Sequence, residues 1–279
     1  MVSNSRALED TSARQQLAES RAVARWRPRQ RWYHPAIART VITTSRFVMR
    51  RMNKLDVEGI ENFEAVQERG GRGLLTFSNH VSLFDDPLLI SNFVRGPYSR
   101  VRWIGADALN FFGSPFKAWL FTAGRAAPIV RGGGIDQPGM RLLRDRLLAG
   151  DWVHMFPEGG RTRDPEGRML ADFKAGAGWL IAETRPIALP FYHYGMHRVL
   201  PVGATRPRSG NRVRVVFGSP LDCDDDWVRR VASEKSGPAL WEGLSSETHD
   251  ILAGMERAVH PAFSSTPHDP SRPQSGLGP

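Results

Sequence analysis

The stretch of residues 73–86, GLLTFSNHVSLFDD, constrains the fold more than any other part of the sequence. Its first half is a short apolar run with a β-branched threonine, bounded by glycines and a polar turn, which is typical of a buried strand. The turn presents His80, Asp85 comes five residues later, and apolar residues from Leu88 to Phe93 predict the inner face of a helix. In open α/β sheets, ligands bind at the carboxyl ends of such strands.

The rest of the chain repeats this order of strand, turn and helix. Further strands are predicted at 55–59, 101–104, 126–130, 152–156, 186–191 and 213–217. Helices are predicted at 61–69, 135–149, 173–184, 224–235 and 239–258. Strands that alternate with helices predict an α/β fold with a mostly parallel central sheet flanked by helices.

The N-terminal region is expected to be helical and to lie at a membrane interface. Residues 1–30 predict a helix that ends near Pro28, and nothing in it demands a buried face. A second helix is predicted from Ala36 to about Met52, with several arginines and flanking aromatic residues. Arginine side chains on such a helix can extend towards lipid phosphates, although an ordinary surface helix packed on the domain fits equally well.

Residues 108–123 form a second segment with two interpretations. Aromatic residues are unusually dense here, and Lys117 is the one charged residue. The segment suits an apolar tunnel or a surface that dips into a membrane, and a buried helical hairpin is the simpler alternative.

Composition limits the class of protein. The 279 residues are 41% hydrophobic, and the net charge of +9 favours a polyanionic partner, either nucleic acid or an anionic membrane surface. The single cysteine, Cys223, excludes an internal disulfide and a site with several cysteine ligands. No uncharged apolar run reaches eighteen residues, and the N-terminus lacks the apolar core of a secretory signal. We therefore expect an intracellular protein, or one attached to a membrane from a reducing compartment.

These observations predict four regions. They are an N-terminal helical segment at the membrane interface (1–53), an α/β domain (54–220), C-terminal helices (221–263) and a disordered tail (264–279), which is rich in Pro, Ser and Gly.

Four polar stretches are expected to meet at the carboxyl edge of the sheet. They are 80–86, 131–132, 158–163 and the end of the PIALP strand at Pro190. Together they bring a histidine, a carboxylate, three arginines and glycine-rich backbone into one crevice. Each has a simpler interpretation, because His80 also suits a polar turn and Asp85 or Asp86 also suits a helix cap.

Four ordered blocks of the sequence resemble the glycerolipid acyltransferases. They are His80-X4-Asp85, the segment Ile129-Val130-Arg131, the block Phe156-Pro157-Glu158-Gly159, and the proline-rich strand 186–190. The wider stretches NHVSLFDDP, PIVRGGGIDQPGM and GDWVHMFPEGG are similar to the tafazzin-like branch of that family. Arg161 and Arg163 depart from that branch and are similar to the acyl-CoA-using lysophosphatidate enzymes.

The resemblance implies a function and a set of site residues. It implies O-acyl transfer to a glycerol-backbone hydroxyl, with His80 as general base and Asp85 as the group that orients its ring. Arg131 and Arg161 would bind the phosphate of the acceptor, and the block Phe156, Pro157, Glu158 and Gly159 would line the substrate site. Glu158 is expected to orient an arginine or a backbone turn.

The same resemblance implies the partners. We expect a phospholipid membrane surface, a lysophospholipid acceptor and an acyl donor, which is either acyl-CoA or a phospholipid, with no metal and no separate cofactor. The expected location is peripheral or monotopic on a membrane, facing the cytoplasm. The products fit either tafazzin-like remodelling or acylation of lysophosphatidate.

Two other classes stay open as alternatives: a non-catalytic peripheral membrane protein and a basic nucleic-acid-binding protein. Lysine is scarce and the aromatic residues lie in apolar sequence, which argues against nucleic acid. A scaffold protein has no use for a paired His80 and Asp85, which argues against the other class.

Overall fold

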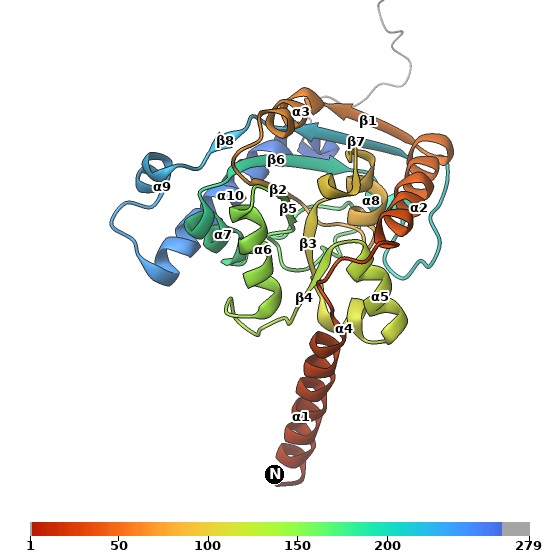
Figure 1. Ribbon diagram of the computed structural model, residues 1–279, viewed down its shortest axis with the longest axis vertical. Coiled ribbons are helices and arrows are strands. Elements are labelled where there is room, and N and C mark those ends of the chain that lie inside the picture. Colours follow the sequence, from red (N-terminus) through yellow and green to blue (C-terminus); the bar gives the residue numbers. More distant parts are fainter. Residues whose placement is uncertain (1, 264–279) are drawn as a thin grey trace, which may run out of the picture.

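A single β-sheet forms the frame of the molecule (Figure 1). The computed structural model describes residues 2–263, with their side chains from residue 14 onward, so the predicted tail 264–279 lies outside the described residues. Within residues 2–263 the sheet has eight strands in the order β1-β7-β6-β2-β5-β3-β4, and β8 pairs with β6. Their bounds are β1 Lys54–Glu58, β2 Leu74–Ser78, β3 Trp103–Asp107, β4 Ala126–Ile129, β5 Trp152–Met155, β6 Ile187–Tyr194, β7 Arg212–Phe217 and β8 Leu221–Asp222.

Strand direction sets the edge at which the polar turns gather. β6, β2, β5, β3 and β4 pair in parallel in that order, whereas β7 and β8 pair with β6 antiparallel and β1 runs parallel to β7. The carboxyl ends of the five parallel strands therefore share one edge. The predicted α/β fold with a mostly parallel sheet is confirmed.

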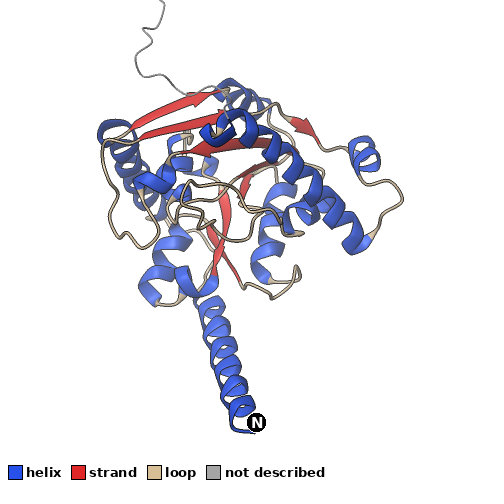
Figure 2. Cartoon of the chain, turned by 180° about the vertical axis from the view of Figure 1, so that it is seen from behind, coloured by secondary structure: helices blue, strands red, loops and turns tan. Residues whose placement is uncertain are grey.

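Helices cover both faces of the sheet (Figure 2). Side chains of β2 alternate between the two layers: Leu75 and Phe77 join one apolar cluster and Leu74 joins the other. The long helices that pack on the first layer include α6, α7 and α10, and the second layer contains α3, α8 and the end of α2. Their bounds are α2 His34–Phe47, α3 Ile60–Arg69, α6 Pro138–Leu148, α7 Gly176–Thr184, α8 Met196–Val199, α9 Asp225–Val231 and α10 Gly237–Val259.

The N-terminal helix α1, Val2–Arg25, extends away from the rest of the molecule in both views (Figures 1 and 2). Its last turns are nevertheless anchored, because Ala22 and Trp26 are buried in the core. The prediction that residues 1–30 need no buried face is therefore wrong at these two positions. A π-helical turn, Val48–Met52, continues α2, so the second predicted helix is present.

The aromatic segment 108–123 is partly buried and partly exposed. It forms two short helices, α4 Ala108–Phe112 and α5 Pro115–Ala123. Phe112 is buried in the core, whereas Phe116 is 67% exposed and Trp119 is 42% exposed. No helix in the described part of the chain is long and apolar enough to cross a membrane.

Two local predictions differ from the structure. The segment after His80 is not a regular α-helix: Asp85–Leu89 is π-helical and Ile90–Asn92 is a 3₁₀ turn. Pro190 does not end its strand, because β6 continues to Tyr194 and pairs with β7 over that extension.

Candidate active site

The turn after β2 is fixed to the neighbouring strand β6. Asn79 is fully buried, and its side-chain amide donates to the carbonyl of His193 over 2.9 Å. The backbone N–H of His193 donates in return to Asn79 Oδ1 over 3.0 Å. These reciprocal hydrogen bonds define the direction in which the chain leaves β2, and so they place the next residue, His80.

His80 and Asp85 form a hydrogen-bonded pair. His80 Nδ1 lies 2.9 Å from Asp85 Oδ2, and the same oxygen accepts the N–H groups of Val81 and Ser82 over 2.8 and 2.9 Å. Asp85 is fully buried. Burial favours its neutral form, but the rings of His193 and His80 and the backbone hydrogen bonds outweigh burial and hold the pKa of Asp85 below its ordinary value.

This pairing determines which nitrogen of His80 is available for chemistry. A carboxylate only accepts hydrogen bonds, so Nδ1 carries the proton that faces Asp85. The side chain of His80 is 17% exposed. Its Nε2 has no hydrogen-bond partner among the described residues, so its lone pair is free to take a proton from a bound hydroxyl.

The loop after β5 surrounds His80 on several sides. The ring of Phe156 stacks on the His80 ring with a centroid distance of 4.0 Å. The Glu158 carboxylate accepts the His80 backbone N–H and, over 2.7 Å, the N–H of Leu170. The N–H of Thr162 donates to the His80 carbonyl over 2.8 Å. Burial raises the pKa of Glu158 to about 8.

Glu158 therefore holds backbone in place. Both of its hydrogen-bond partners among the described residues are backbone N–H groups and neither is an arginine, which matches the second of its two predicted roles. Pro157 and Gly159 shape the same loop. The carbonyl of Pro157 accepts the N–H of Lys174 over 2.8 Å, and Gly159 has φ +66°, a conformation that favours glycine.

The structure brings the predicted arginines to this loop. Arg131 Nε lies 2.9 Å from Asp107 Oδ2, and its guanidinium lies 3.9 Å from the position of a Cβ on Gly160. The Arg131 side chain is 61% exposed. Arg161 and Arg163 follow in the same loop, and neither has a hydrogen bond or ion pair with any described residue.

Sequence reasoning missed the two buried histidines behind the pair. His193 is fully buried, and its Nε2 lies 3.7 Å from Asp85 Oδ2 and 2.9 Å from the carbonyl of Asn79. His154 is also fully buried, with Nδ1 2.9 Å from Thr76 Oγ1. Burial lowers the pKa of both rings. Each of these histidines interrupts the apolar run of a central strand, and that pattern could have identified it as a candidate site residue.

The predicted capping role of Asp85 or Asp86 is wrong, because no side chain caps the π-helical turn in which both residues lie. Ser82 Oγ donates to the carbonyl of Leu200 over 3.1 Å. Asp86 forms a two-pronged ion pair with Arg102, which is 5% exposed and also donates to the carbonyl of Gly124 over 2.8 Å. The described residues contain no group of three or more His, Cys, Asp or Glu side chains placed to hold a metal.

Comparison with known proteins agrees with this geometry. The Acyltransferase family model matches residues 54–194, which include every residue of the His80 site named above except Leu200. A tafazzin from Drosophila melanogaster is 33% identical over 247 residues, 82% of this chain and 64% of its own length. An N-acylphosphatidylethanolamine synthase from Arabidopsis thaliana is 32% identical over 201 residues, 66% of this chain and 70% of its own length.

A third relative and one solved structure complete the comparison. A protein named taffazin from Dictyostelium discoideum is 37% identical over 163 residues, 55% of this chain. The chain thus spans only 56% and 64% of the lengths of the Dictyostelium and Drosophila proteins. The fold is similar to the crystal structure of the 1-acyl-sn-glycerophosphate (LPA) acyltransferase PlsC from Thermotoga maritima, with a TM-score of 0.56 and 21% identity over 80% of this chain and 79% of that one. The resemblance to the tafazzin-like glycerolipid acyltransferases is confirmed, and the chain belongs to the Acyltransferase family.

Proposed function

We propose that this chain is a phospholipid or lysophospholipid O-acyltransferase that moves a fatty acyl group onto a glycerol-backbone hydroxyl. One observation carries the proposal: the 2.9 Å contact between His80 Nδ1 and the buried Asp85 carboxylate, which leaves Nε2 facing away from its partner. Relatives named as tafazzins and as an N-acylphosphatidylethanolamine synthase support an acyl group as the unit transferred.

His80 acts as general base and then as general acid. Its Nε2 takes the proton of the acceptor hydroxyl while the hydroxyl oxygen attacks the carbonyl carbon of the acyl donor. The new C–O bond gives a tetrahedral intermediate, and its collapse breaks the bond to the leaving thiol or alcohol. The leaving atom then takes the proton from the imidazolium. Asp85 holds the ring in the required tautomer and stabilises its positive charge in between.

Arg131 and Arg161 bind the phosphate of the acceptor. Guanidinium groups give paired hydrogen bonds to phosphate oxygens. Arg161 belongs to the loop after β5, and the Arg131 guanidinium lies next to Gly160 of the same loop. Asp107 orients Arg131 through their ion pair. Because the Arg131 side chain is largely exposed, its other nitrogens can reach a phosphate. Phe156, Pro157, Glu158 and Gly159 shape the floor of the site around His80. The acyl donor is acyl-CoA or another phospholipid, and the reaction needs no other cofactor.

The protein attaches to the membrane surface from the cytoplasmic side. Apolar side chains that are exposed in water stand on three elements of the N-terminal half, namely Phe47 at the end of α2, Phe116 and Trp119 on α5, and Trp32 before α2. An amphipathic surface of this kind lies in the interface plane without crossing the bilayer.

The experiment that tests the activity uses the full chain with a phospholipid labelled in its acyl group and an unlabelled lysophospholipid, with and without acyl-CoA. We expect label in the newly acylated lipid, and the addition of unlabelled acyl-CoA shows which donor is used. Phosphatidylethanolamine, offered as a separate acceptor, reports any N-acyl product.

His80→Ala is the matched loss-of-function variant, and His249→Ala on α10 is its control because His249 lies outside the site. Loss of a general base lowers turnover by about a hundred- to ten-thousand-fold. Transfer by folded His80→Ala within a few-fold of the wild type would reject the proposal, and so would the absence of any acyl transfer by the wild type.

A further inference from the structure

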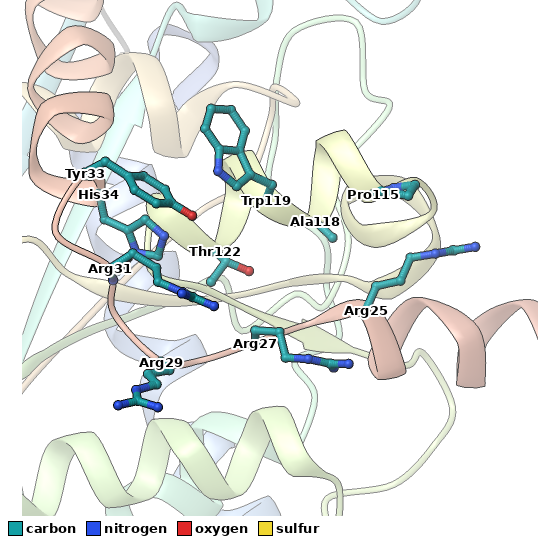
Figure 3. Close-up of a pocket in the computed structure, with 10 residues that line it drawn as sticks. All are labelled: Arg25, Arg27, Arg29, Arg31, Tyr33, His34, Pro115, Ala118, Trp119 and Thr122. Atoms are coloured by element: carbon teal, nitrogen blue, oxygen red, sulfur yellow. Dashed lines mark hydrogen bonds between the residues drawn. The ribbon is translucent and has the colours of Figure 1, made fainter.

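Four arginines alternate from the last residue of α1 through the linker to α2 and line a cavity of about 270 Å³ against α5 (Figure 3). We call this cavity the arginine pocket and define it by Arg25, Arg27, Arg29, Arg31, Tyr33 and Trp119. The residue between the first two arginines fixes the linker. Trp26 is 8% exposed, and its indole N–H donates to the carbonyl of Ala126, the first residue of β4, over 3.1 Å.

The charges of the arginine pocket have no counter-ions among the residues that the structure describes. No aspartate or glutamate lines it. Arg25 and Arg27 donate only to backbone carbonyls, and the Arg29 and Arg31 side chains have no partner in the described part of the chain. Four adjacent cations repel one another, and an anion bound among them relieves that repulsion.

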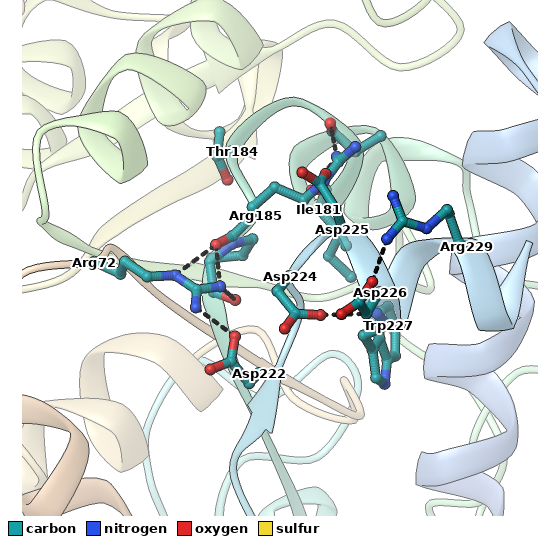
Figure 4. Close-up of polar contacts among 12 residues, drawn as sticks. Arg72, Ile181, Thr184, Arg185, Asp222, Asp224, Asp225, Asp226, Trp227 and Arg229 are labelled. Carbon is teal, nitrogen blue, oxygen red and sulfur yellow. Dashed lines mark hydrogen bonds and ion pairs between the residues drawn. The ribbon is translucent and has the colours of Figure 1, made fainter.

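Several arginines elsewhere on the surface are paired with carboxylates. Arg72 pairs with Asp222, and Arg185 Nε lies 2.7 Å from Asp225 Oδ1 (Figure 4). Arg214 holds Glu58 through two nitrogens. The arginine pocket differs from these ion pairs because four arginines gather there with no carboxylate among the residues that line it.

Exposed aromatic side chains border the arginine pocket. Trp32 is 91% exposed, Phe116 is 67% exposed and Trp119 is 42% exposed. They form a connected row, because the Tyr33 ring lies 5.7 Å from Trp32 and 6.2 Å from Trp119, which lies 5.8 Å from Phe116. Aromatic residues with one apolar and one polar side favour the membrane interface, where lipid phosphates lie at the same depth.

We propose that the arginine pocket binds the phosphate group of an anionic phospholipid in a bilayer, with Trp32, Phe116 and Trp119 inserted beside it at the headgroup boundary. The occupant is a membrane lipid and not a soluble phosphate ester, because the exposed aromatic rings beside the pocket suit insertion at the headgroup boundary of a bilayer. The proposal rests on the membrane attachment proposed above, but not on acyl transfer.

The arginine pocket is separate from the candidate active site. Its linker is fixed to the first residue of β4, whereas His80 follows the carboxyl end of the parallel strand β2. None of the residues that define the pocket contacts His80, Asp85 or Glu158 through a hydrogen bond or ion pair. A lipid in the pocket therefore anchors the protein on the membrane and leaves His80 free for substrate.

Vesicle flotation of the full chain tests the proposal. The probes are vesicles of phosphatidylcholine alone and of phosphatidylcholine with one-fifth phosphatidylglycerol. The pocket variant is Arg27→Gln/Arg29→Gln/Arg31→Gln. The control variant, Arg69→Gln/Arg206→Gln/Arg230→Gln, removes the same charge from exposed arginines without partners among the described residues. Thermal melting of each variant confirms that it is folded.

We expect the pocket variant to lose about a hundredfold in partition onto the anionic vesicles at low salt, since each basic residue near such a surface contributes about fivefold. The control variant should lose less than tenfold, and binding to neutral vesicles should differ little between the two. Replacing Trp32 by Ala, at a position that is 91% exposed, should weaken the part of binding that survives high salt.

Equal losses in the pocket and control variants would reject the proposal, because net charge alone would then account for binding. A pocket variant that loses binding to duplex DNA but keeps its binding to anionic vesicles would also reject it, in favour of a nucleic-acid site. Flotation measures binding and needs no turnover. The result therefore holds even if the protein shows no acyl transfer, and acyl transfer activity would not support the pocket if flotation contradicts it.

Discussion

Two adjacent carboxylates, Asp85 and Asp86, have different roles because their side chains point to different partners. Asp85 faces His80 and two backbone N–H groups, whereas Asp86 neutralises the buried Arg102. The sequence alone does not show which aspartate pairs with His80, because Asp85 and Asp86 follow it by five and six residues. The distinction depends on the irregular π-helical turn, Asp85–Leu89, in which both residues lie.

Replacing each aspartate by Asn should separate catalysis from stability. We expect Asp85→Asn to lower kcat by a hundredfold or more, because the amide no longer fixes the ring tautomer or stabilises the imidazolium. Asp86→Asn should instead lower the free energy of unfolding by about 3 kcal/mol, the usual effect of leaving a buried charge unpaired, and change kcat by a few-fold at most. Steady-state kinetics measure the effect on kcat, and urea unfolding measures the effect on stability. A larger loss of kcat in Asp86→Asn than in Asp85→Asn would show that Asp86, not Asp85, is the partner of His80 in catalysis.

Removing the proposed phosphate-binding arginines should change substrate affinity. We expect Arg131→Ala and Arg161→Ala to raise KM for phosphate-bearing acceptors about tenfold each, since one charge-assisted contact in the ground state is worth ~1.5 kcal/mol. Arg163→Ala, two residues further along the same loop, should change KM little. Unchanged kinetics for both Arg131→Ala and Arg161→Ala with every acceptor would show that neither arginine binds the acceptor phosphate.

The local sequence predicted the site residues that lie on loops, but not the buried histidines of the site that lie on strands. His80, Asp85, Arg131 and Glu158 stand out because they follow predicted strands and belong to the ordered blocks that resemble the glycerolipid acyltransferases. His193 contacts Asp85 only because β6 lies beside β2, and that neighbour relation has no local signature. Arg102 is likewise far from Asp86 in sequence, so its pairing required the three-dimensional structure.

At the scale of elements, the contact between α7 and α10 depends on Gly178. A Cβ at this position would lie 1.9 Å from the carbonyl oxygen of Trp241 and 2.8 Å from Ser245 Oγ. The N–H of Gly178 also donates to that hydroxyl over 3.0 Å. The two helices therefore approach each other closely at the one residue that has no side chain.

Gly178→Ala should consequently destabilise the protein, although alanine is the better helix former. We expect a loss of about 2–3 kcal/mol in the free energy of unfolding, because forcing a methyl group into a packed contact displaces α10. Gly254→Ala on α10 is the control, since its Cβ would meet only the Arg257 side chain at 3.9 Å, and it should be neutral or stabilising by up to ~1 kcal/mol. Thermal melting compares the two, and equal effects would contradict the packing argument.

The elements themselves were largely predictable. Most strands and helices occur within a few residues of the predicted bounds, because apolar runs of four to eight residues between turn signals are typical of buried strands. The exceptions arise from tertiary contacts. β6 extends past Pro190 because β7 pairs with its last residues, and the segment after His80 is irregular because the Asp85 side chain must reach backwards.

At the scale of the whole molecule, buried ionisable groups link stability to pH in opposite directions. His154 and His193 are buried with lowered pKa values, so below the ordinary histidine value of 6.5 the unfolded chain binds protons that the folded chain does not. Stability is lost there as pH falls. Glu158 has its pKa raised from 4.5 to about 8, so between these values the folded chain holds a proton that the unfolded chain lacks. Its contribution is lost as pH rises.

A single substitution isolates the Glu158 contribution between pH 6.5 and 8. The wild type and Glu158→Gln share the histidine contribution, which still acts just above pH 6.5, so the difference between their slopes reports Glu158 alone. We expect the slope of the free energy of unfolding against pH to be more negative in the wild type than in Glu158→Gln by up to ~1.4 kcal/mol per pH unit, the value for one proton. Glu158→Gln cannot release a proton at this position, whatever its stability at pH 6.5. Glu166→Gln, at an exposed carboxylate, should keep the wild-type slope. Urea unfolding at four pH values measures all three, and parallel slopes in the wild type and Glu158→Gln would mean that Glu158 is ionised in the folded protein throughout the window.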